Sequence, residues 1–226
     1  MDLNDFQKGI IEMAYQSHKD FVEENREAVK IANETLKEFH REIELWDDSK
    51  DIEFIFADNN EKYLIGERPN NICDEGNANH TRKNFIKFMH DKRTKNIVKK
   101  MFNLRKKNEL DFTIPARVYK LALFDHLKEY KFRGDKPWLY TLRFVIMTFP
   151  ELFTTIADRK KLFKTAKILQ FQNVRDDKKN YRFELVEFQI RSAVDSYLKE
   201  MGVLDDLTLW GNAAVAYNIV DEYKRA

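Results

Sequence analysis

The chain has 226 residues, of which 43% are hydrophobic and 35% are charged, and its formal net charge is +2. This length fits one domain, or one domain with an appendage, and an aromatic content of 13% excludes wholesale disorder. Six glycines and four prolines disfavour an all-β fold with many tight turns, and one cysteine excludes an internal disulfide or a cysteine-based zinc cage within one chain.

The charge is distributed unevenly along the chain. Residues 1–81 contain 9 basic and 20 acidic side chains, which gives a net charge of −11. Residues 82–107 contain 11 basic side chains and one acidic side chain, a net charge of +10, and the rest of the chain carries +3. This asymmetry is the strongest functional signal in the sequence.

The first predicted element is a long amphipathic helix over residues 2–46, either continuous or broken near residues 17–20. It rests on apolar residues that recur at spacings of mostly three, four or seven. These residues are Phe6, Ile10, Ala14, Phe21, Ala28, Ala32, Leu36, Phe39, Ile43 and Trp46. A continuous helix would span ~65 Å, so we expect it to fold back, project, or form a homodimeric coiled coil.

The segment after the acidic helix is predicted to contain a small β-hairpin. Its strands would be residues 52–56 and 62–65, and the polar residues between them would form the turn. A Gly- and Asn-rich loop over residues 67–80 follows. The predicted domains are therefore an acidic helical arm plus hairpin over 1–66, the loop 67–80, and a helical core over 81–226.

The core domain is predicted to be helical throughout. The predicted helices comprise a basic segment over 81–108, one opened by Thr113 and Pro115, Trp138–Phe149, one from Pro150 to about Leu169, Tyr181–Met201, and about Asp206–Tyr223. The third of these is apolar almost all round, which predicts a central buried helix, and Gly202 is predicted to close the fifth. The predicted fold class is mainly α: a helical bundle with a long N-terminal helix or helical hairpin and one small β-hairpin.

The basic segment is the predicted binding site. Ile97, Met101 and Leu104 share one face of its helix, so basic side chains on the other face would form a ridge. The predicted nucleic-acid-binding residues are Lys87, Lys92, Arg93, Lys95, Lys99, Lys100, Arg105, Lys106 and Lys107. Such a ridge would neutralise phosphates and release counterions, and Asn84, Asn96 and Asn103 could add hydrogen bonds. Phe85, Phe88 and Phe102 are predicted to be core residues.

Three interpretations of the basic segment stay open. The ridge could bind nucleic acid, or it could lie against the acidic helix of residues 1–46 so that the two charge blocks cancel. It could also be a solvated helix face without a specific role. Surface ion pairs are individually worth only ~0–1 kcal/mol, yet they can fix how two helices dock.

An enzymatic alternative rests on acidic residues of the N-terminal helix. Glu23-Glu24-x-x-Glu27, followed by Glu44-x-x-Asp47, resembles in spacing the signature of the all-α NTP pyrophosphohydrolases of the MazG type. That resemblance implies carboxylates that gather Mg²⁺ ions around a triphosphate. The alternative function is therefore a metal-dependent phosphohydrolase or nuclease. A solvated acidic face is the favoured interpretation, because the apolar pattern continues without a break between the two acidic groups.

Two further groups of residues have the types of side chain that bind metals. His90-Asp91 resembles the dipeptide of HD-type phosphohydrolases, with His80 or His40 and Asp125 as further ligands, but Lys92-Arg93 would disfavour a cation beside it. The segment from Cys73 to His80 also holds two carboxylates in an ordinary loop composition. Our prediction is therefore no metal, no cofactor and no catalytic residue.

The function predicted from the sequence is a non-enzymatic helical protein that binds nucleic acid or another polyanion through its basic helix. The acidic arm would serve dimerisation or docking of an intracellular protein partner, which gives a second alternative in which the basic helix is paired internally. No targeting signal is recognisable, and the longest apolar run is far short of the ~20 residues of a membrane span. We therefore expect a cytoplasmic protein without membrane contact, and the Lys-, Asn- and Phe-rich composition suggests a bacterial or phage origin.

Overall fold

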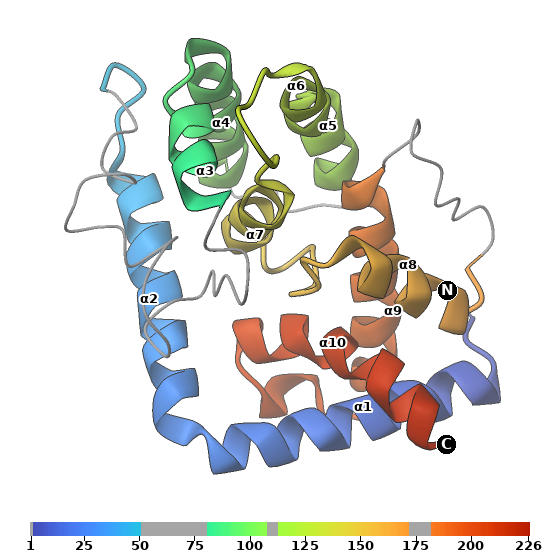
Figure 1. The fold of residues 1–226 in the computed structure, drawn as a ribbon. Coiled ribbons are helices and arrows are strands. Elements are labelled where there is room, and N and C mark those ends of the chain that lie inside the picture. The colour runs from blue at the N-terminus through green and yellow to red at the C-terminus, as the bar shows by residue number, and fades with distance from the viewer. Residues whose placement is uncertain (1, 51–80, 108–112, 172–181) are drawn as a thin grey trace. The chain divides into compact units, whose positions relative to one another are not determined.

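The computed structural model describes residues 2–50, 81–107, 113–171 and 182–226 (Figure 1). These residues are mainly helical, which confirms the predicted class, and no strand occurs among them. The hairpin predicted for residues 52–65 lies outside the described ranges. Within those ranges, no helix is long and apolar enough to cross a membrane.

Contacts within the chain divide it into two units. The first unit comprises Met1–Arg26 and Pro150–Ala226, and the second comprises Glu27–Phe149. The start of the chain therefore folds with its last third. The arm, loop and core division predicted from the sequence stays a prediction, because its boundaries at residues 66 and 80 lie outside the described residues.

The N-terminal pattern forms two helices, α1 (Asp5–Glu24) and α2 (Arg26–Leu45). They are separated at Asn25, whose backbone N–H and side-chain Nδ2 both donate to the carbonyl of Phe21, at 3.0 and 2.9 Å. Helix α1 ends here because the backbone of Asn25 leaves the helical region, at φ −121° and ψ 33°, while its side-chain amide binds the Phe21 carbonyl beside the last helical N–H. The predicted break near residues 17–20 is thus displaced to residue 25.

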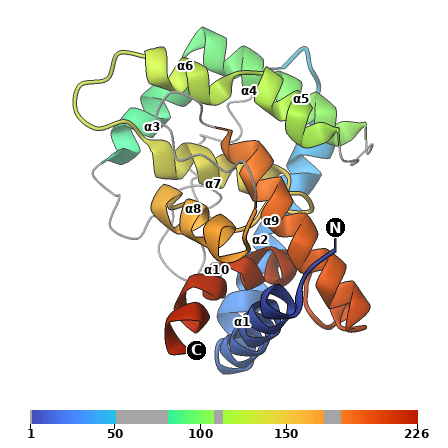
Figure 2. The same ribbon diagram turned by 90° about the vertical axis from the view of Figure 1, so that its right-hand side faces the viewer.

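The first unit is built from α1, α8 (Arg159–Ile168), α9 (Phe183–Glu200) and α10 (Leu209–Arg225). A 3₁₀ turn over Leu204–Asp206 links the last two. Helix α1 packs along α10 and also contacts α9, and α8 packs on both α9 and α10 (Figures 1 and 2). The buried stripe of α1 consists of Gln7, Ile10, Ile11, Ala14, Tyr15 and His18. Contacts within the chain thus occupy this stripe, which gives no support to a coiled coil through it.

The first turn of α1 is fixed to the end of α8. Asn4 and Gln7 form a capping box, with Asn4 N to Gln7 Oε1 at 2.8 Å and Gln7 N to Asn4 Oδ1 at 2.9 Å. The Gln7 amide also donates to the carbonyl of Leu169, the residue that closes α8. One side chain therefore satisfies an orphan group at each of two helix ends.

The helix predicted from Pro150 begins only at Arg159. Before it, the backbone N–H of Thr154 donates to the Glu187 carboxylate at 3.1 Å, and that of Thr155 donates to the Ala213 carbonyl at 2.9 Å. These two N–H groups donate to α9 and α10 and do not form the hydrogen bonds of a helix over residues 150–158. Asp158 then caps the first turn of α8. The end of α9 is as predicted: Gly202 has φ +74° and follows the helix.

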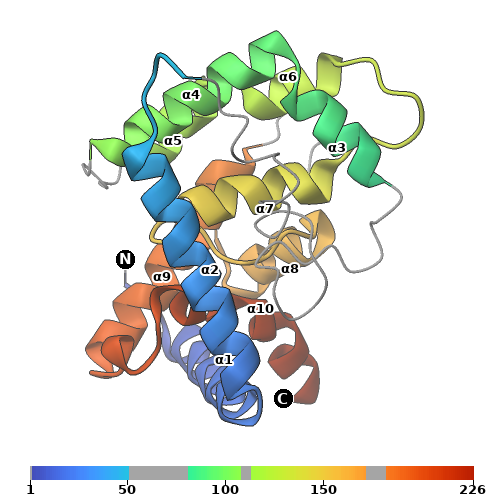
Figure 3. The ribbon, with the colours of Figure 1, turned by 90° about the vertical axis from the view of Figure 1, so that its left-hand side faces the viewer.

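The second unit contains α2, α3 (Arg82–Met89), α4 (Lys92–Lys106), α5 (Ile114–Lys120), α6 (Leu123–Glu129) and α7 (Trp138–Thr148). Helices α3 and α4 both pack on α7, and α4 also packs on α6 (Figure 3). The ring of Phe39 from α2 lies 6.2 Å from Phe102 and 6.4 Å from Phe144. The buried central helix is confirmed, and so is the core position of Phe85, Phe88 and Phe102, whose exposed fractions are all 0%.

The junction between α5 and α6 strains its backbone at Ala122, which has φ 57° and ψ 35° in the left-handed region. A residue with a side chain is strained there by about 1–2 kcal/mol, so a glycine at this position relieves the strain. Part of this stabilisation is lost, because glycine also gives the unfolded chain more conformational freedom. We expect Ala122→Gly to raise the free energy of unfolding by about 0.5–1 kcal/mol in urea titrations. Ala116→Gly, at an exposed position inside α5, should lower it by about 1 kcal/mol. Equal losses in the two variants would contradict the prediction.

Candidate nucleic-acid interface

The basic segment forms two helices, so the single helix predicted over residues 81–108 is wrong. The chain breaks at Asp91, which is extended at φ −63° and ψ 138° and is the N-cap of α4. Its Oδ2 accepts hydrogen bonds from the backbone N–H groups of Arg93 and Thr94, at 2.9 and 3.1 Å. A short acidic side chain in this position satisfies donors that the first turn of a helix leaves free.

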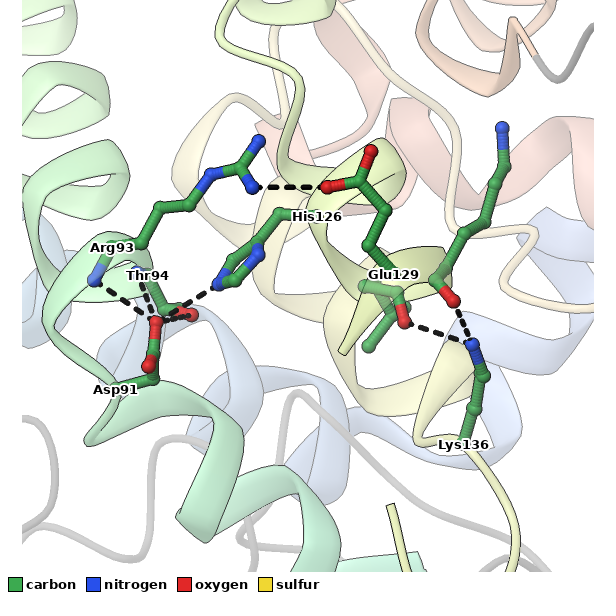
Figure 4. A network of polar contacts seen from close by, with 8 residues as sticks. Asp91, Arg93, Thr94, His126, Glu129 and Lys136 are labelled. Carbon is green, nitrogen blue, oxygen red and sulfur yellow. Dashed lines mark hydrogen bonds and ion pairs between the residues drawn. The ribbon is translucent and has the colours of Figure 1, made fainter. Parts of the chain in front are cut away.

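Asp91 also joins α4 to α6 (Figure 4). Nε2 of His126 lies 2.9 Å from Asp91 Oδ2, and the Arg93 guanidinium lies 3.0 Å from the carboxylate of Glu129. Burial raises the pKa of Asp91, but hydrogen bonds from His126, Thr94 and Arg93 outweigh it and leave the pKa below its usual value. Asp91, which the sequence analysis considered as a metal ligand together with His90, therefore caps a helix. His90 itself is exposed.

Arg105 is one of the predicted binding residues, but its guanidinium is used inside the second unit. It donates to the carbonyl of Thr148 at 2.7 Å and lies 2.8 Å from Nδ1 of His40. Nε2 of His40 in turn lies 2.9 Å from the carbonyl of Met147. Both side chains thus reach the last carbonyls of α7, where a helix end attracts positive charge. Arg105 holds α2, α4 and α7 together.

Two lysines of α4 contact Trp46, which follows α2 and is only 4% exposed. The ammonium groups of Lys99 and Lys106 lie 6.0 and 5.7 Å from the centre of its indole ring. Lys106 also donates to the carbonyl of Trp46, and Lys99 donates to that of Asp48 at 3.4 Å. These contacts between α4 and the end of the acidic arm therefore use an aromatic face and backbone carbonyls.

The remaining basic residues of the site differ in exposure. Lys95 is half-buried, whereas four predicted residues are exposed and their ammonium groups make no hydrogen bond or ion pair within the described residues. These four are Lys87, Lys92, Lys100 and Lys107. Lys83, one turn before Lys87 on α3, has the same properties. It belongs to the basic segment, and its spacing of four from Lys87 is the signal that could have added it to the predicted site.

Lys92, Lys100 and Lys107, which we call the α4 strip, lie on one side of the α4 axis. At 100° per residue they fall within an arc of about 80°, and Asn96 and Asn103 lie within the same arc. The opposite side of α4 buries Ile97, Val98, Met101 and Phe102 in the core. Asn84, which was also predicted to bond nucleic acid, uses its amide within the chain: it donates to the carbonyls of Arg133 and Asp135 at 3.0 and 2.8 Å.

The acidic residues of the enzymatic alternative lie in both units. Glu23 and Glu24 are exposed on α1, and Glu27, Glu44 and Asp47 are exposed in the second unit. The backbone N–H of Ser49 donates to Asp47 and lowers the pKa of that carboxyl. Across the described residues, no group of three or more His, Cys, Asp or Glu side chains is placed to hold a metal ion. The segment from Cys73 to His80 lies outside those residues, and the alternative stays a prediction.

Comparisons of the chain with protein-family models, with curated proteins and with solved structures found no match.

Proposed function

We propose that the second unit binds nucleic acid through the α4 strip, with Lys87 on α3 as a further contact, and that it does so without catalysis. The observation that supports this most is the state of Lys92, Lys100 and Lys107. They are exposed and unpartnered within the described part of the chain, on a helix that contains no carboxylate of its own. Exposed cations that no local acid neutralises are available to an external anion.

The dimensions of the strip fit an extended polyanion. Fifteen residues separate Lys92 from Lys107, which corresponds to a rise of ~22 Å along the helix. One strand of duplex DNA presents a charge about every 3.4 Å along its axis, so the strip can follow about six phosphates. The helix is held on its opposite side by the buried core, so the three lysines extend from one rigid backbone and their spacing is fixed.

The residues between the lysines favour nucleic acid over an acidic protein. Asn96 is exposed and Asn103 half-buried on the same arc, and amide groups can bond phosphate oxygens and base edges. The phenylalanines of the two helices that carry these lysines, Phe85, Phe88 and Phe102, are buried. They therefore offer no surface on which bases could stack. The proposed binding is driven by phosphate contacts and independent of sequence.

The test replaces the strip with neutral residues in Lys92→Gln/Lys100→Gln/Lys107→Gln. In the wild type, the four lysine–phosphate contacts of Lys87 and the α4 strip contribute about −3.6 to the slope of log K against log salt on duplex DNA. This contribution alone lowers affinity about 100-fold between 50 and 200 mM salt. The triple variant should reduce the slope by about 3, because each lysine contributes about one unit. Fluorescence anisotropy with a labelled duplex and a labelled single-stranded RNA measures both quantities.

A matched control separates the strip from net charge. Lys30, Lys37 and Lys131 are also exposed lysines of the second unit, but they lie outside α3 and α4. The Lys30→Gln/Lys37→Gln/Lys131→Gln variant changes the net charge equally and should keep the wild-type slope. A wild-type slope near zero on both nucleic acids would refute the proposal, and so would equal losses in the two triple variants.

A protein partner is the second candidate, supported by exposed apolar side chains on α1. Phe6, Met13 and Phe21 are 46%, 39% and 51% exposed. Exposed large apolar residues gathered on one helix are typical of interaction surfaces. Because contacts within the chain cover the buried stripe of α1, a partner or a second copy would use this outer face. Light scattering across a concentration series tests self-association directly.

A further inference from the structure

A second group of exposed lysines lies on α8, in the first unit. The helix has the sequence RKKLFKTAKI, with five basic residues and no acidic residue. Lys160, Lys164 and Lys167, which we call the α8 strip, are exposed, and their ammonium groups make no hydrogen bond or ion pair within the described ranges. Their spacings of four and three place them within an arc of about 60° on the helix.

The opposite side of α8 is firmly held. Leu162, Phe163 and Ala166 are 0%, 4% and 0% exposed. Lys161, which is absent from the strip, is used for packing: its ammonium group lies 2.9 Å from the carboxylate of Asp221 and 3.3 Å from the centre of the Tyr217 ring. These contacts tie α8 to α10 through a side chain that lies outside the arc of the strip.

Two carboxylates that contact α8, those of Asp158 and Asp221, have other partners within the described residues. Asp158 accepts the backbone N–H of Lys161 as the cap of α8. Asp221 pairs with Lys161 and with Lys224. The hydrogen bond from Lys224, and next that from Lys161, lower the pKa of Asp221 to about 2. Neither of these two carboxylates pairs with a lysine of the α8 strip.

Comparison with α2 shows that exposure alone does not define such a strip. Lys30 and Lys37 are exposed on α2, but Glu27, Glu34 and Glu38 lie on the same helix within four residues of one or the other. That arrangement is a solvated face of mixed charge, in which neighbouring charges offset one another. By contrast, α4 and α8 present positive charge without acidic neighbours on the helix.

We propose that the α8 strip is a second phosphate-binding surface for nucleic acid, so that each unit of the chain carries one and a single strand binds to both. The inference rests on the proposed function for the class of ligand, but on different residues. When one strip has bound, the second contact becomes intramolecular, and the effective concentration of the strand at the second strip rises. Affinity therefore increases steeply once a strand is long enough to reach both strips.

The experiment measures binding of labelled oligo(dT) from 6 to 60 nucleotides to the full chain by fluorescence anisotropy. The Lys160→Gln/Lys164→Gln/Lys167→Gln variant should bind the 60-mer at least ~10-fold more weakly than the wild type and lose the steep dependence on length. Its salt slope should fall by about 2, because single strands give about 0.7 per contact. As the strand is shortened toward the 6-mer, this loss should shrink toward the factor of about 2 that is expected when each strand contacts a single strip.

The two sets of variants separate the two proposals. If the α8 variant matches the Lys30→Gln/Lys37→Gln/Lys131→Gln control at every length while the α4 variant loses affinity, the inference is overturned and the proposed function stands. If only the α8 variant loses affinity, the proposed function of the α4 strip is overturned and nucleic-acid binding by the α8 strip stands. If the α8 variant weakens binding equally at all lengths, bivalent binding is overturned. Equal binding of poly-glutamate would overturn the assignment to nucleic acid in favour of an acidic protein.

Discussion

Replacing Arg191 with methionine is expected to lower the free energy of unfolding by about 1–2 kcal/mol at pH 7, because protonation of the partly exposed Asp195 limits the cost of losing its cation. The Arg191 side chain on α9 is only 4% exposed, and its Nε lies 3.1 Å from Oδ2 of Asp195, one turn later. Burial lowers the pKa of Arg191, while the charges of Asp195 and Glu151 oppose that shift. Methionine keeps the length of the side chain but leaves a partly buried carboxylate without its cation. Urea unfolding followed by circular dichroism measures the loss.

The double variant Arg191→Met/Asp195→Asn is the control for this prediction. Removing both charges avoids an uncompensated carboxylate, so the double variant should recover most of the stability that Arg191→Met loses. The defect of Arg191→Met should also shrink on acidification, as Asp195 becomes protonated. An Arg191→Met protein as stable as the wild type would show that the pair contributes nothing to the fold.

Protonation of His18 is expected to cost the fold about 3 kcal/mol in acid. The imidazole is 7% exposed, and burial lowers the pKa of His18 from 6.5 to about 4. The folded state disfavours the charged ring, so the fold has its full stability above pH 6.5, where His18 is neutral in both states. This contribution to stability is lost as the pH falls toward 4. About 2 kcal/mol of it is lost between pH 6 and pH 4. The measurement is the free energy of unfolding against pH for the wild type and for His18→Gln.

Asp195 acts in the opposite direction over the same range. Burial raises the pKa of Asp195 to about 6, although Arg191 opposes the shift. Its ionisation therefore costs stability as the pH rises from 3.8 to about 6, and acidification from pH 6 to pH 4 returns about 2 kcal/mol. We expect a nearly flat wild-type profile, a His18→Gln variant that gains stability toward pH 4, and an Asp195→Asn variant that loses it. Identical slopes in all three proteins would contradict both assignments.

The basic segment shows what local pattern can and cannot reveal. Its helical character and the inward position of Phe85, Phe88 and Phe102 could be predicted, since apolar spacing reports which face is buried. The break at Asp91 could not, because an acidic residue between basic ones fits a helix interior, a cap or a metal ligand equally. The hydrogen bond from His126, 35 positions later, shows the capping carboxylate to be part of a contact between α4 and α6.

The start of α8 is decided by contacts with distant parts of the chain. The helical pattern predicted from Pro150 continues through residues 150–158, but the outcome depends on where the backbone donors find acceptors. At Thr154 and Thr155 these acceptors are Glu187 of α9 and a carbonyl of α10, which compete with helix formation. Such partners lie far away in the sequence, so periodicity carries no trace of them.

The sequence by itself determined the helical class, the buried α7, the glycine end of α9 and the separation of charge into acidic and basic blocks. These follow from composition and from spacing within a few residues, which act before distant parts of the chain meet. Only the tertiary structure decided which cations are free, since Arg105 reaches the end of α7 and Lys106 reaches Trp46, whereas Lys92 and Lys100 remain exposed. The availability of a charge depends on neighbours that folding brings within a few ångströms, because Coulomb and hydrogen-bond energies fall off with distance in space and not along the chain.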